Sequence, residues 1–245
     1  AFLNGDVDED IYMEQPEGCK DADHPDHVCK LNKALYGLKQ APRQWNAKMD
    51  SFLIENLGFT SSPNDPCLYI KHTDSEFIMI ALYVDDLLIA ANNITVTAWI
   101  KTELHNRFEM KDLGEAKICL GLEINRDREQ RKLWLGQSDY ASAVLKRFGM
   151  EDCKPISTPM DPNISIADNR YGEIPITHAP YRQAIGSLMY LMVGTRPDLA
   201  LSVGRLAQFS ALPTDEHWTA VKRVFRYLAG AGSCRSSLME TRQMS

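Results

Sequence analysis

Two adjacent aspartates, Asp85 and Asp86, interrupt one of the longest apolar runs of the chain, which covers residues 77–84 and resumes over 87–91. Burying two neighbouring carboxylates in such surroundings is costly unless a cation or hydrogen bonds compensate them. A β-hairpin avoids this cost, because each apolar run then forms a strand and the aspartates lie at the turn. Hard divalent cations such as Mg²⁺ take oxygen ligands of this kind. The pattern therefore predicts a metal-dependent phosphoryl-transfer site on a hairpin, although aspartate is also common in turns that bind nothing.

A second segment places glycine, basic and aromatic side chains in front of a predicted helix. It reads Lys-Ala-Leu-Tyr-Gly-Leu-Lys-Gln-Ala-Pro-Arg-Gln-Trp over residues 33–45. Pro42 is typical of a first helical turn, and Gly58 follows the expected end of the helix. Apolar residues then recur at helical spacing, namely Trp45, Met49, Phe52 and Leu53. A loop that carries Gly37, Lys39 and Arg43 at a helix start is well placed to receive phosphates.

The periodicity of the chain predicts an antiparallel sheet backed by helices, followed by a helical module. The first thirty residues are expected to hold a short strand and an acidic loop. Further strands are expected over residues 27–31, 67–71, 76–83 and 87–91, with a second hairpin over 117–135. Helices are expected over residues 42–57, 94–107, 138–149, 181–193, 197–210 and 215–229. Residues 154–180 carry five prolines and form a long connection. This order is an α+β layout.

Composition is compatible with a protein that folds around a sizeable core. The chain has 245 residues, of which 44% are hydrophobic. Its six cysteines are scattered without paired spacing, which indicates reduced thiols and an intracellular protein. Every apolar run is shorter than the roughly 20 residues of a membrane span, so no membrane partner is expected.

Charge is distributed unevenly along the chain, whose net charge is −6. Residues 6–26 hold nine acidic residues against one lysine, whereas residues 28–48 hold five basic residues and no acidic one. From residue 181 onward, eight basic residues accompany four acidic ones. Nucleic acids are bound mainly through their phosphates, so local basic stripes matter more than the total charge. Solvated surface faces give the same pattern, and this alternative stays open.

Several motifs, in order, resemble the reverse transcriptases of the Ty1/copia class of retrotransposons. The first are Ala-Phe-Leu-Asn-Gly-Asp at 1–6, Ile-Tyr-Met-Glu-Gln-Pro-Glu-Gly at 11–18, the segment 35–45, and Tyr-Val-Asp-Asp at 83–86. Met-Lys-Asp-Leu-Gly at 110–114, Leu-Gly-Leu-Glu-Ile at 120–124 and Gly-Ser-Leu-Met-Tyr at 186–190 follow. Thr-Arg-Pro-Asp at 195–198 and Glu-His-Trp at 216–218 complete the set. The resemblance extends from residue 1 to about residue 230.

This resemblance implies an RNA-directed DNA polymerase that transfers nucleotides onto a primer 3′-hydroxyl with two Mg²⁺ or Mn²⁺ ions. Residues 1–136 are then an incomplete palm, with most of the fingers upstream of Ala1. Residues 137–230 are the helical thumb or connection, with the proline-rich linker at 154–180, and residues 231–245 are an irregular tail. The implied partners are an RNA or DNA template with its primer, deoxynucleoside triphosphates, and the integrase and ribonuclease H of the same polyprotein. The implied location is a cytoplasmic particle.

The resemblance also assigns roles to individual residues. Asp85 and Asp86 are the expected metal ligands and catalytic carboxylates, and Lys111 is the expected proton donor to the departing pyrophosphate. The predicted primer contacts are Tyr83, Val84, Leu120 and Gly121. The predicted nucleotide contacts are Phe2, Tyr36, Gly37 and Lys39. The predicted contacts to the nucleic-acid backbone are Lys33 and Arg43.

Phe2 matches the aromatic position that crowds the sugar 2′ carbon in this family and so favours deoxynucleotides. Ordinary core packing is the alternative for Phe2 and for Tyr36.

The chain departs from the family pattern at both ends. The first catalytic aspartate of the family belongs to a motif shortly upstream of Ala1, and Asp6 and Asp8 are poor substitutes because they lie in the acidic loop. We therefore expect the isolated segment to be inactive. Residues 233–245 match nothing in the family. A decayed or non-catalytic fragment that binds nucleic acid is the alternative function, and a palm-type nucleotide cyclase is a weaker one.

Histidine and cysteine positions suggest no further catalytic site. Cys19, His24, His27 and Cys29 have a spacing that fits no common zinc pattern. His105 and His217 are expected to be structural, because no serine or cysteine nucleophile motif accompanies them.

Overall fold

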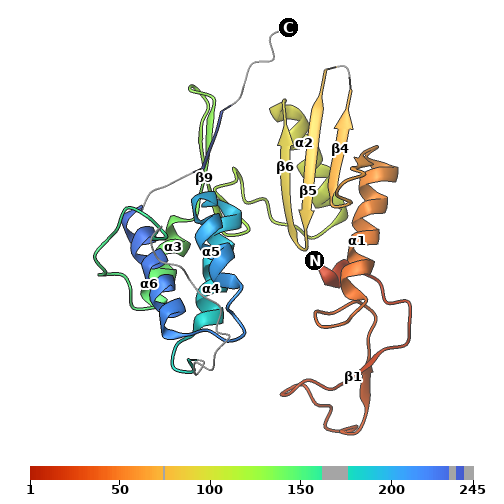
Figure 1. Cartoon of the computed structure of the whole chain (residues 1–245). Coiled ribbons are helices and arrows are strands. Elements are labelled where there is room, and N and C mark those ends of the chain that lie inside the picture. The colour runs from red at the N-terminus through yellow and green to blue at the C-terminus, as the bar shows by residue number, and fades with distance from the viewer. Residues whose placement is uncertain (74, 162–175, 232–235, 240–245) are drawn as a thin grey trace. The chain divides into compact units, whose positions relative to one another are not determined.

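The computed structural model describes residues 1–73, 75–161, 176–231 and 236–239 (Figure 1). The chain divides into two compact units, Ala1–Gly114 and Glu115–Ser245. Much of the predicted proline-rich linker, residues 162–175, lies outside the described residues. Among the described helices, none is long and apolar enough to cross a membrane.

The first unit begins with short elements. A 3-10 turn, η1 (Phe2–Asn4), precedes an antiparallel pair of strands, β1 (Tyr12–Glu14) and β2 (Val28–Lys30). Helix α1 (Ala41–Ser51) follows and continues into a π-helical segment, η2 (Phe52–Asn56). Gly58 ends this helix with φ of +71°, a left-handed conformation that glycine adopts without steric cost.

Four antiparallel strands form the sheet of the first unit. They are β3 (Thr60–Ser61), β4 (Leu68–His72), β5 (Phe77–Tyr83) and β6 (Asp86–Ala91), in that spatial order. Helix α2 (Ile94–Arg107) comes next and is capped by Asn93, whose side chain accepts a hydrogen bond from the amide of Thr95.

One hydrophobic core joins the sheet and both helices of the first unit. Alternate residues of β5, namely Ile78, Ile80 and Leu82, are buried, as the period of a strand requires. Trp45, Met49, Phe52 and Leu53 are all buried on one face of α1 and η2, as their helical spacing predicted. Ile100 and Leu104 of α2 complete the same core.

The second unit combines an antiparallel sheet with a bundle of helices. Its strands are β7 (Ile118–Cys119), β8 (Leu122–Asp127), β9 (Lys132–Gly136) and β10 (Ser236–Met239), in the spatial order β10-β9-β8-β7. Its helices are α3 (Ser138–Arg147), α4 (Tyr181–Gly194), the 3-10 turn η3 (Pro197–Leu199), α5 (Ala200–Ala207) and α6 (Asp215–Gly230). The helices share a core that includes Leu188, Val203 and Phe225.

The antiparallel sheets and the six α-helices of the described residues confirm the α+β class, and the predicted helices lie within a few residues of the observed ones. The start of the chain differs from prediction. In place of a strand, residues 2–4 form a 3-10 turn, because the backbone and side-chain amides of Asn4 both donate to the carbonyl of Ala1. Strand β1 then lies inside the expected acidic loop.

Two further differences concern the second unit. Residues 236–239, expected in an irregular tail, form a strand that pairs with β9. The hairpin of β8 and β9, grouped with the palm by sequence, belongs to the second compact unit. The assignment of palm and thumb stays a prediction.

Candidate active site

The turn between β5 and β6 presents the predicted carboxylates. Tyr83 pairs with Asp86, which leaves Val84 and Asp85 as a two-residue turn. Both aspartates are exposed. The sequence placed the pair together at the turn, whereas the structure places Asp85 within it and Asp86 at the first position of β6. Val84 has φ of +55°, a left-handed conformation that is strained for a β-branched residue.

The turn is anchored by side chains from the segment 33–45. The indole Nε1 of Trp45 donates a 2.5 Å hydrogen bond to the carbonyl of Val84. The hydroxyl of Tyr36 donates a 2.8 Å hydrogen bond to Oδ2 of Asp85. Trp45 is 2% exposed and packs in the core of the first unit. The two segments that the sequence singled out therefore meet at one turn.

Tyr36 and Phe2 form an aromatic pair beside Asp85. Their ring centroids are 4.3 Å apart, with the planes at 41°. Phe2 is 8% exposed and packs in the core, which agrees with the packing alternative for this residue, whereas Tyr36 is 62% exposed. The hydrogen bond to Asp85 raises the pKa of the Tyr36 hydroxyl, because the neutral phenol is the donor. The nucleotide contacts of both residues stay predictions.

Asp6 is held by two lysines. Lys33 Nζ lies 2.5 Å from Oδ1 of Asp6, and Lys48 Nζ lies 2.8 Å from Oδ2. These hydrogen bonds from Lys33 and then Lys48 lower the pKa of Asp6 to about 2. Lys33 is therefore already paired with a carboxylate, and its contact to the nucleic-acid backbone stays a prediction. Asp6 in turn has both oxygens occupied, and Asp8 accepts a hydrogen bond from Gln44.

The loop that the sequence predicts to receive phosphates is exposed to solvent. Gly37 has φ of +98° with open space around it, and Lys39 and Arg43 are exposed. Within the described residues, neither cation has a hydrogen bond or an ion pair. Both side chains are thus available to an anion at the start of α1.

The carboxylates of the turn supply part of the ligand set that Mg²⁺ needs. Asp85 and Asp86 offer carboxylate oxygens, and Mg²⁺ commonly binds to one or two carboxylates while keeping waters and phosphate oxygens as its other ligands. The residues therefore fit Mg²⁺ as a partial site. Across the described ranges, no group of three or more His, Cys, Asp or Glu side chains is arranged to hold a metal ion. Lys111 is exposed, and no hydrogen bond or ion pair joins it to either aspartate in the described chain.

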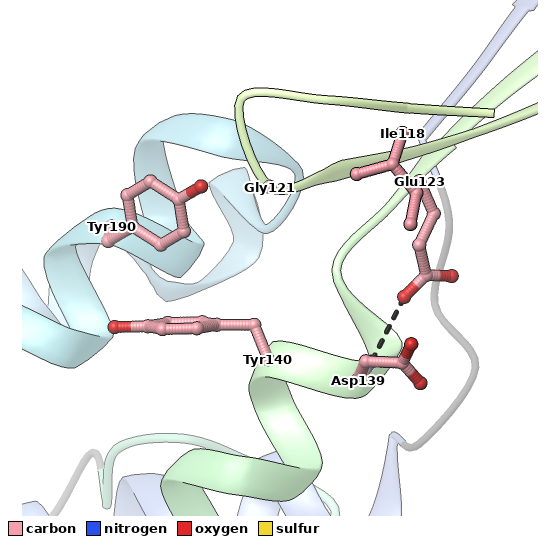
Figure 2. Close-up of a pocket in the computed structure, with 6 residues that line it drawn as sticks. All are labelled: Ile118, Gly121, Glu123, Asp139, Tyr140 and Tyr190. Atoms are coloured by element: carbon pink, nitrogen blue, oxygen red, sulfur yellow. Dashed lines mark hydrogen bonds between the residues drawn. The ribbon is translucent and has the colours of Figure 1, made fainter. Parts of the chain in front are cut away.

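The other predicted primer contacts, Leu120 and Gly121, form the turn between β7 and β8 in the second unit. Their φ angles are +50° and +78°, and Cys119 pairs with Leu122 across the turn. The hydroxyl of Tyr190 donates a 2.7 Å hydrogen bond to the carbonyl of Leu120. Figure 2 shows the adjoining cavity of about 440 Å³, whose lining is Ile118, Gly121, Glu123, Asp139, Tyr140 and Tyr190.

Comparison with known proteins decides the family. Residues 1–162 match the family described as reverse transcriptase (RNA-dependent DNA polymerase). The chain belongs to this family. This match and the transposon relatives described next together confirm the resemblance to the reverse transcriptases of the Ty1/copia class.

Individual relatives of this reverse transcriptase chain are encoded by plant and yeast transposons. The retrovirus-related Pol polyprotein from transposon TNT 1-94 of Nicotiana tabacum is 47% identical over 96% of the chain, which covers 18% of that protein. The Pol polyprotein from transposon RE1 of Arabidopsis thaliana is 42% identical over 94% of the chain, or 15% of that protein. The putative transposon Ty5-1 protein YCL074W of Saccharomyces cerevisiae is 34% identical over 93% of the chain, or 73% of its own length. No solved structure matches.

Sequence reasoning missed two side chains that bind the turns carrying predicted site residues, one in each unit. Trp45 was predicted as part of an apolar helix face, yet its indole also binds the turn before Asp85. Tyr190 was noted as the end of the motif at 186–190, and its hydroxyl binds the turn that contains Gly121. For Tyr190, the available signal was its position as the last residue of a motif that also matches the family.

Proposed function

We propose that the chain is the palm-and-thumb part of an RNA-directed DNA polymerase within a retrotransposon Pol polyprotein. The observation that carries the proposal is the turn at Val84 and Asp85. Two exposed carboxylates lie in this turn and at the residue that follows it, and hydrogen bonds from Tyr36 and Trp45 hold the turn. A catalytic group must be held in place in this way to contribute to a reaction.

The chemistry of the proposed site needs divalent cations, Mg²⁺ or Mn²⁺, with two ions in the complete enzyme. When bound, such ions lower the pKa of the primer hydroxyl and neutralise charge on the triphosphate. Asp85 and Asp86 supply oxygen ligands. Tyr36 occupies one oxygen of Asp85 and so orients the carboxylate. Lys111 is proposed to donate a proton to the departing pyrophosphate.

The proposed substrates are deoxynucleoside triphosphates and a primer on an RNA or DNA template. Lys39 and Arg43 carry exposed charges at the start of α1, unpaired within the described residues, and phosphates are favoured at such a helix start. Tyr83 and Val84 are proposed to contact the primer end. In the complete polyprotein we expect an integrase and a ribonuclease H alongside this part, in a cytoplasmic particle.

A second candidate function is nucleic-acid binding without catalysis. It is favoured by the donor set, since within the described residues a third carboxylate does not join Asp85 and Asp86 in a metal-holding group. A pair of carboxylates without the family's upstream aspartate holds two ions poorly, so we propose that the isolated segment is inactive.

Primer extension on an RNA template tests these proposals. It should be measured with the chain as given and with a version extended upstream by the family's first aspartate motif. We expect extension by the longer version only, and a loss of at least about 100-fold in Asp85→Asn, because even outer-shell partners of a metal are worth 10–100-fold. Asp26→Asn, in the exposed loop, is the matched control and should keep full activity.

Two outcomes would change the proposal. Asp85-dependent extension by the chain as given would overturn its predicted inactivity. Salt-dependent binding of a primer–template duplex by the longer version, without any extension, would favour the binding function over the polymerase.

A further inference from the structure

The turn between β7 and β8 has an unusual backbone. Leu120 and Gly121, its two central residues, both have positive φ, the pattern of a type I′ hairpin turn. Such turns favour asparagine or glycine at the first position, because a left-handed conformation strains other side chains. Leucine has no side-chain group that could hydrogen-bond locally and offset this strain. The conformation of the turn therefore needs support from outside the hairpin.

Tyr190 supplies a direct contact of this kind. Its hydroxyl donates to the carbonyl of Leu120 at 2.7 Å, although the two residues are 70 positions apart in the chain. A β-carbon added to Gly121 would lie 2.6 Å from the same hydroxyl oxygen. The hydroxyl thus fills the space beside Gly121 that any other residue would need. The hydroxyl oxygen of Tyr190 therefore binds the turn and also occupies the space that a β-carbon at position 121 would need.

The ring of Tyr190 is itself held in place. Tyr140, from α3, meets it edge to face, with centroids 4.7 Å apart and planes at 72° (Figure 2). The start of α3 is tied to β8, because the amide of Asp139 donates to the carboxylate of Glu123 at 2.9 Å. Helices α3 and α4 therefore both contact the hairpin around the cavity.

The turn offers an apolar surface. The side chains of Ile118 and Leu120 are exposed, although both are large and hydrophobic. The backbone carbonyl of Leu120 is occupied by Tyr190, which leaves the apolar side chains as the main groups presented outward. A surface of this kind suits the sugar and base of a nucleotide better than its phosphates.

We propose that Tyr190 is a positioning residue that fixes the β7–β8 turn through its hydroxyl, so that the turn holds the primer terminus in one place. The proposal rests on the proposed function, in which Leu120 and Gly121 contact the primer. Tyr190 itself touches the turn, and its effect on the primer passes through Leu120 and Gly121.

Hydrogen exchange of the whole chain tests the structural half of this proposal without any activity. Tyr190→Phe removes the hydroxyl and keeps the ring. We expect backbone amides of the peptide that spans residues 118–124 to exchange about fivefold faster, since a single hydrogen bond is lost. Tyr140→Phe is the matched control, because the Tyr140 hydroxyl has no hydrogen-bond partner in the described chain. Equal exchange in Tyr190→Phe and wild type would overturn the proposal.

Photo-crosslinking tests the functional half. A primer–template duplex with a photoreactive 3′-terminal nucleotide should crosslink within residues 118–122 of the wild-type chain. We expect Tyr190→Phe to reduce that crosslink about fivefold while the affinity for the duplex stays unchanged, because affinity depends mainly on phosphate contacts. Tyr140→Phe should crosslink as wild type does.

The outcomes separate this inference from the function on which it rests. Strong binding with an unchanged crosslink in Tyr190→Phe would overturn the positioning role and leave the proposed function intact. In the upstream-extended version, a mispositioned primer should lower kcat about fivefold and leave KM for the nucleotide unchanged. A change in KM alone would overturn the positioning role, and failure of the wild-type chain to bind the duplex would overturn both proposals.

Discussion

The hydroxyl of Tyr36 donates a hydrogen bond to the carboxylate of Asp85 across 49 residues of sequence. The bond connects the segment 33–45 to the turn before β6. Each segment was singled out by its own sequence, but only the fold shows that they share an atom-to-atom contact. The carboxylate proposed to bind a cation is therefore already bound on one oxygen by a neutral donor.

Replacing Asp85 should change the titration of Tyr36. The bond to Asp85 is the leading cause of the raised pKa of Tyr36, so Asp85→Asn is expected to lower that pKa toward its ordinary value of 10.0. NMR titration of ring-labelled tyrosine, assigned with Tyr36→Phe, measures this. Asp86→Asn is the control, since Asp86 makes no hydrogen bond to Tyr36 in the described chain, and an equal decrease in both variants would contradict the contact.

The backbone strain at Val84 gives a second prediction. A β-branched residue at φ of +55° is strained by about 1–2 kcal/mol, and glycine is free of that cost. Glycine also loses more conformational entropy on folding, and this loss offsets part of the strain that is relieved. Val84→Gly should therefore raise the free energy of unfolding by about 0.5–1 kcal/mol. Urea unfolding measures it.

The matched control for Val84 is Ala90→Gly, an exposed position within β6. There glycine brings the entropy cost without relief of strain, so the protein should lose about 0.5–1 kcal/mol. If both variants were destabilised equally, the strain at Val84 would be refuted. We also expect Val84→Gly to slow primer extension in the longer version, because a more flexible turn holds Asp85 less well.

Gly121 should be far less tolerant of alanine than Gly149. Both glycines are left-handed, at φ of +78° and +63°, but the added β-carbon meets the Tyr190 hydroxyl at Gly121 and open space at Gly149. We expect Gly121→Ala to destabilise the protein by about 1–3 kcal/mol more than Gly149→Ala, as overpacking does. Combining Gly121→Ala with Tyr190→Phe should recover most of that excess in urea unfolding, and a strictly additive double variant would contradict the clash.

Apolar patterning predicted most of the fold, because burial at period 2 or 3.6 acts locally and leaves a clear trace in the sequence. The strand β5 and the helix α2 are examples, with α2 observed at the predicted 94–107. Strand β10 left no such trace, since residues 236–239 are placed by pairing with β9, about 100 positions earlier.

The candidate site likewise has features that the sequence predicted and features that only the fold shows. Asp85 and Asp86 were predictable, because two adjacent charges in an apolar run are costly to bury and so indicate an exposed turn. The pairing of Lys33 with Asp6 was not, since basic and acidic segments read as two separate faces until the fold joins them. The left-handed turn at Leu120 likewise depends on Tyr190, a residue in another element.

Salt dependence of binding should distinguish Arg43 from Lys33. Arg43 is exposed and unpaired within the described chain, whereas Lys33 is held by Asp6. Arg43→Gln is expected to reduce the slope of log K against log salt by about 1 for a primer–template duplex. Lys33→Gln changes the net charge by the same amount and should alter the slope by much less. Equal changes of slope would mean that total charge, rather than a local phosphate contact, governs binding.

The pairing of Asp6 with Lys33 and Lys48 should appear as a pH-dependent part of the stability. The pKa of Asp6 falls from 3.8 to about 2 on folding, so the stabilisation is complete above pH 3.8 and is lost as the pH falls through about 2. Asp6 is 65% exposed, and exposed ion pairs are screened by solvent, so we expect these pairs to stabilise the protein by at most about 1 kcal/mol at neutral pH.

The difference in the free energy of unfolding between wild type and Asp6→Asn, measured with urea, should therefore shrink between pH 4 and pH 2. Asp8→Asn, whose partner is the neutral Gln44, is the control and should show a smaller difference at neutral pH. A difference for Asp6→Asn that persisted unchanged at pH 2 would mean that the carboxylate is not stabilised by its lysines.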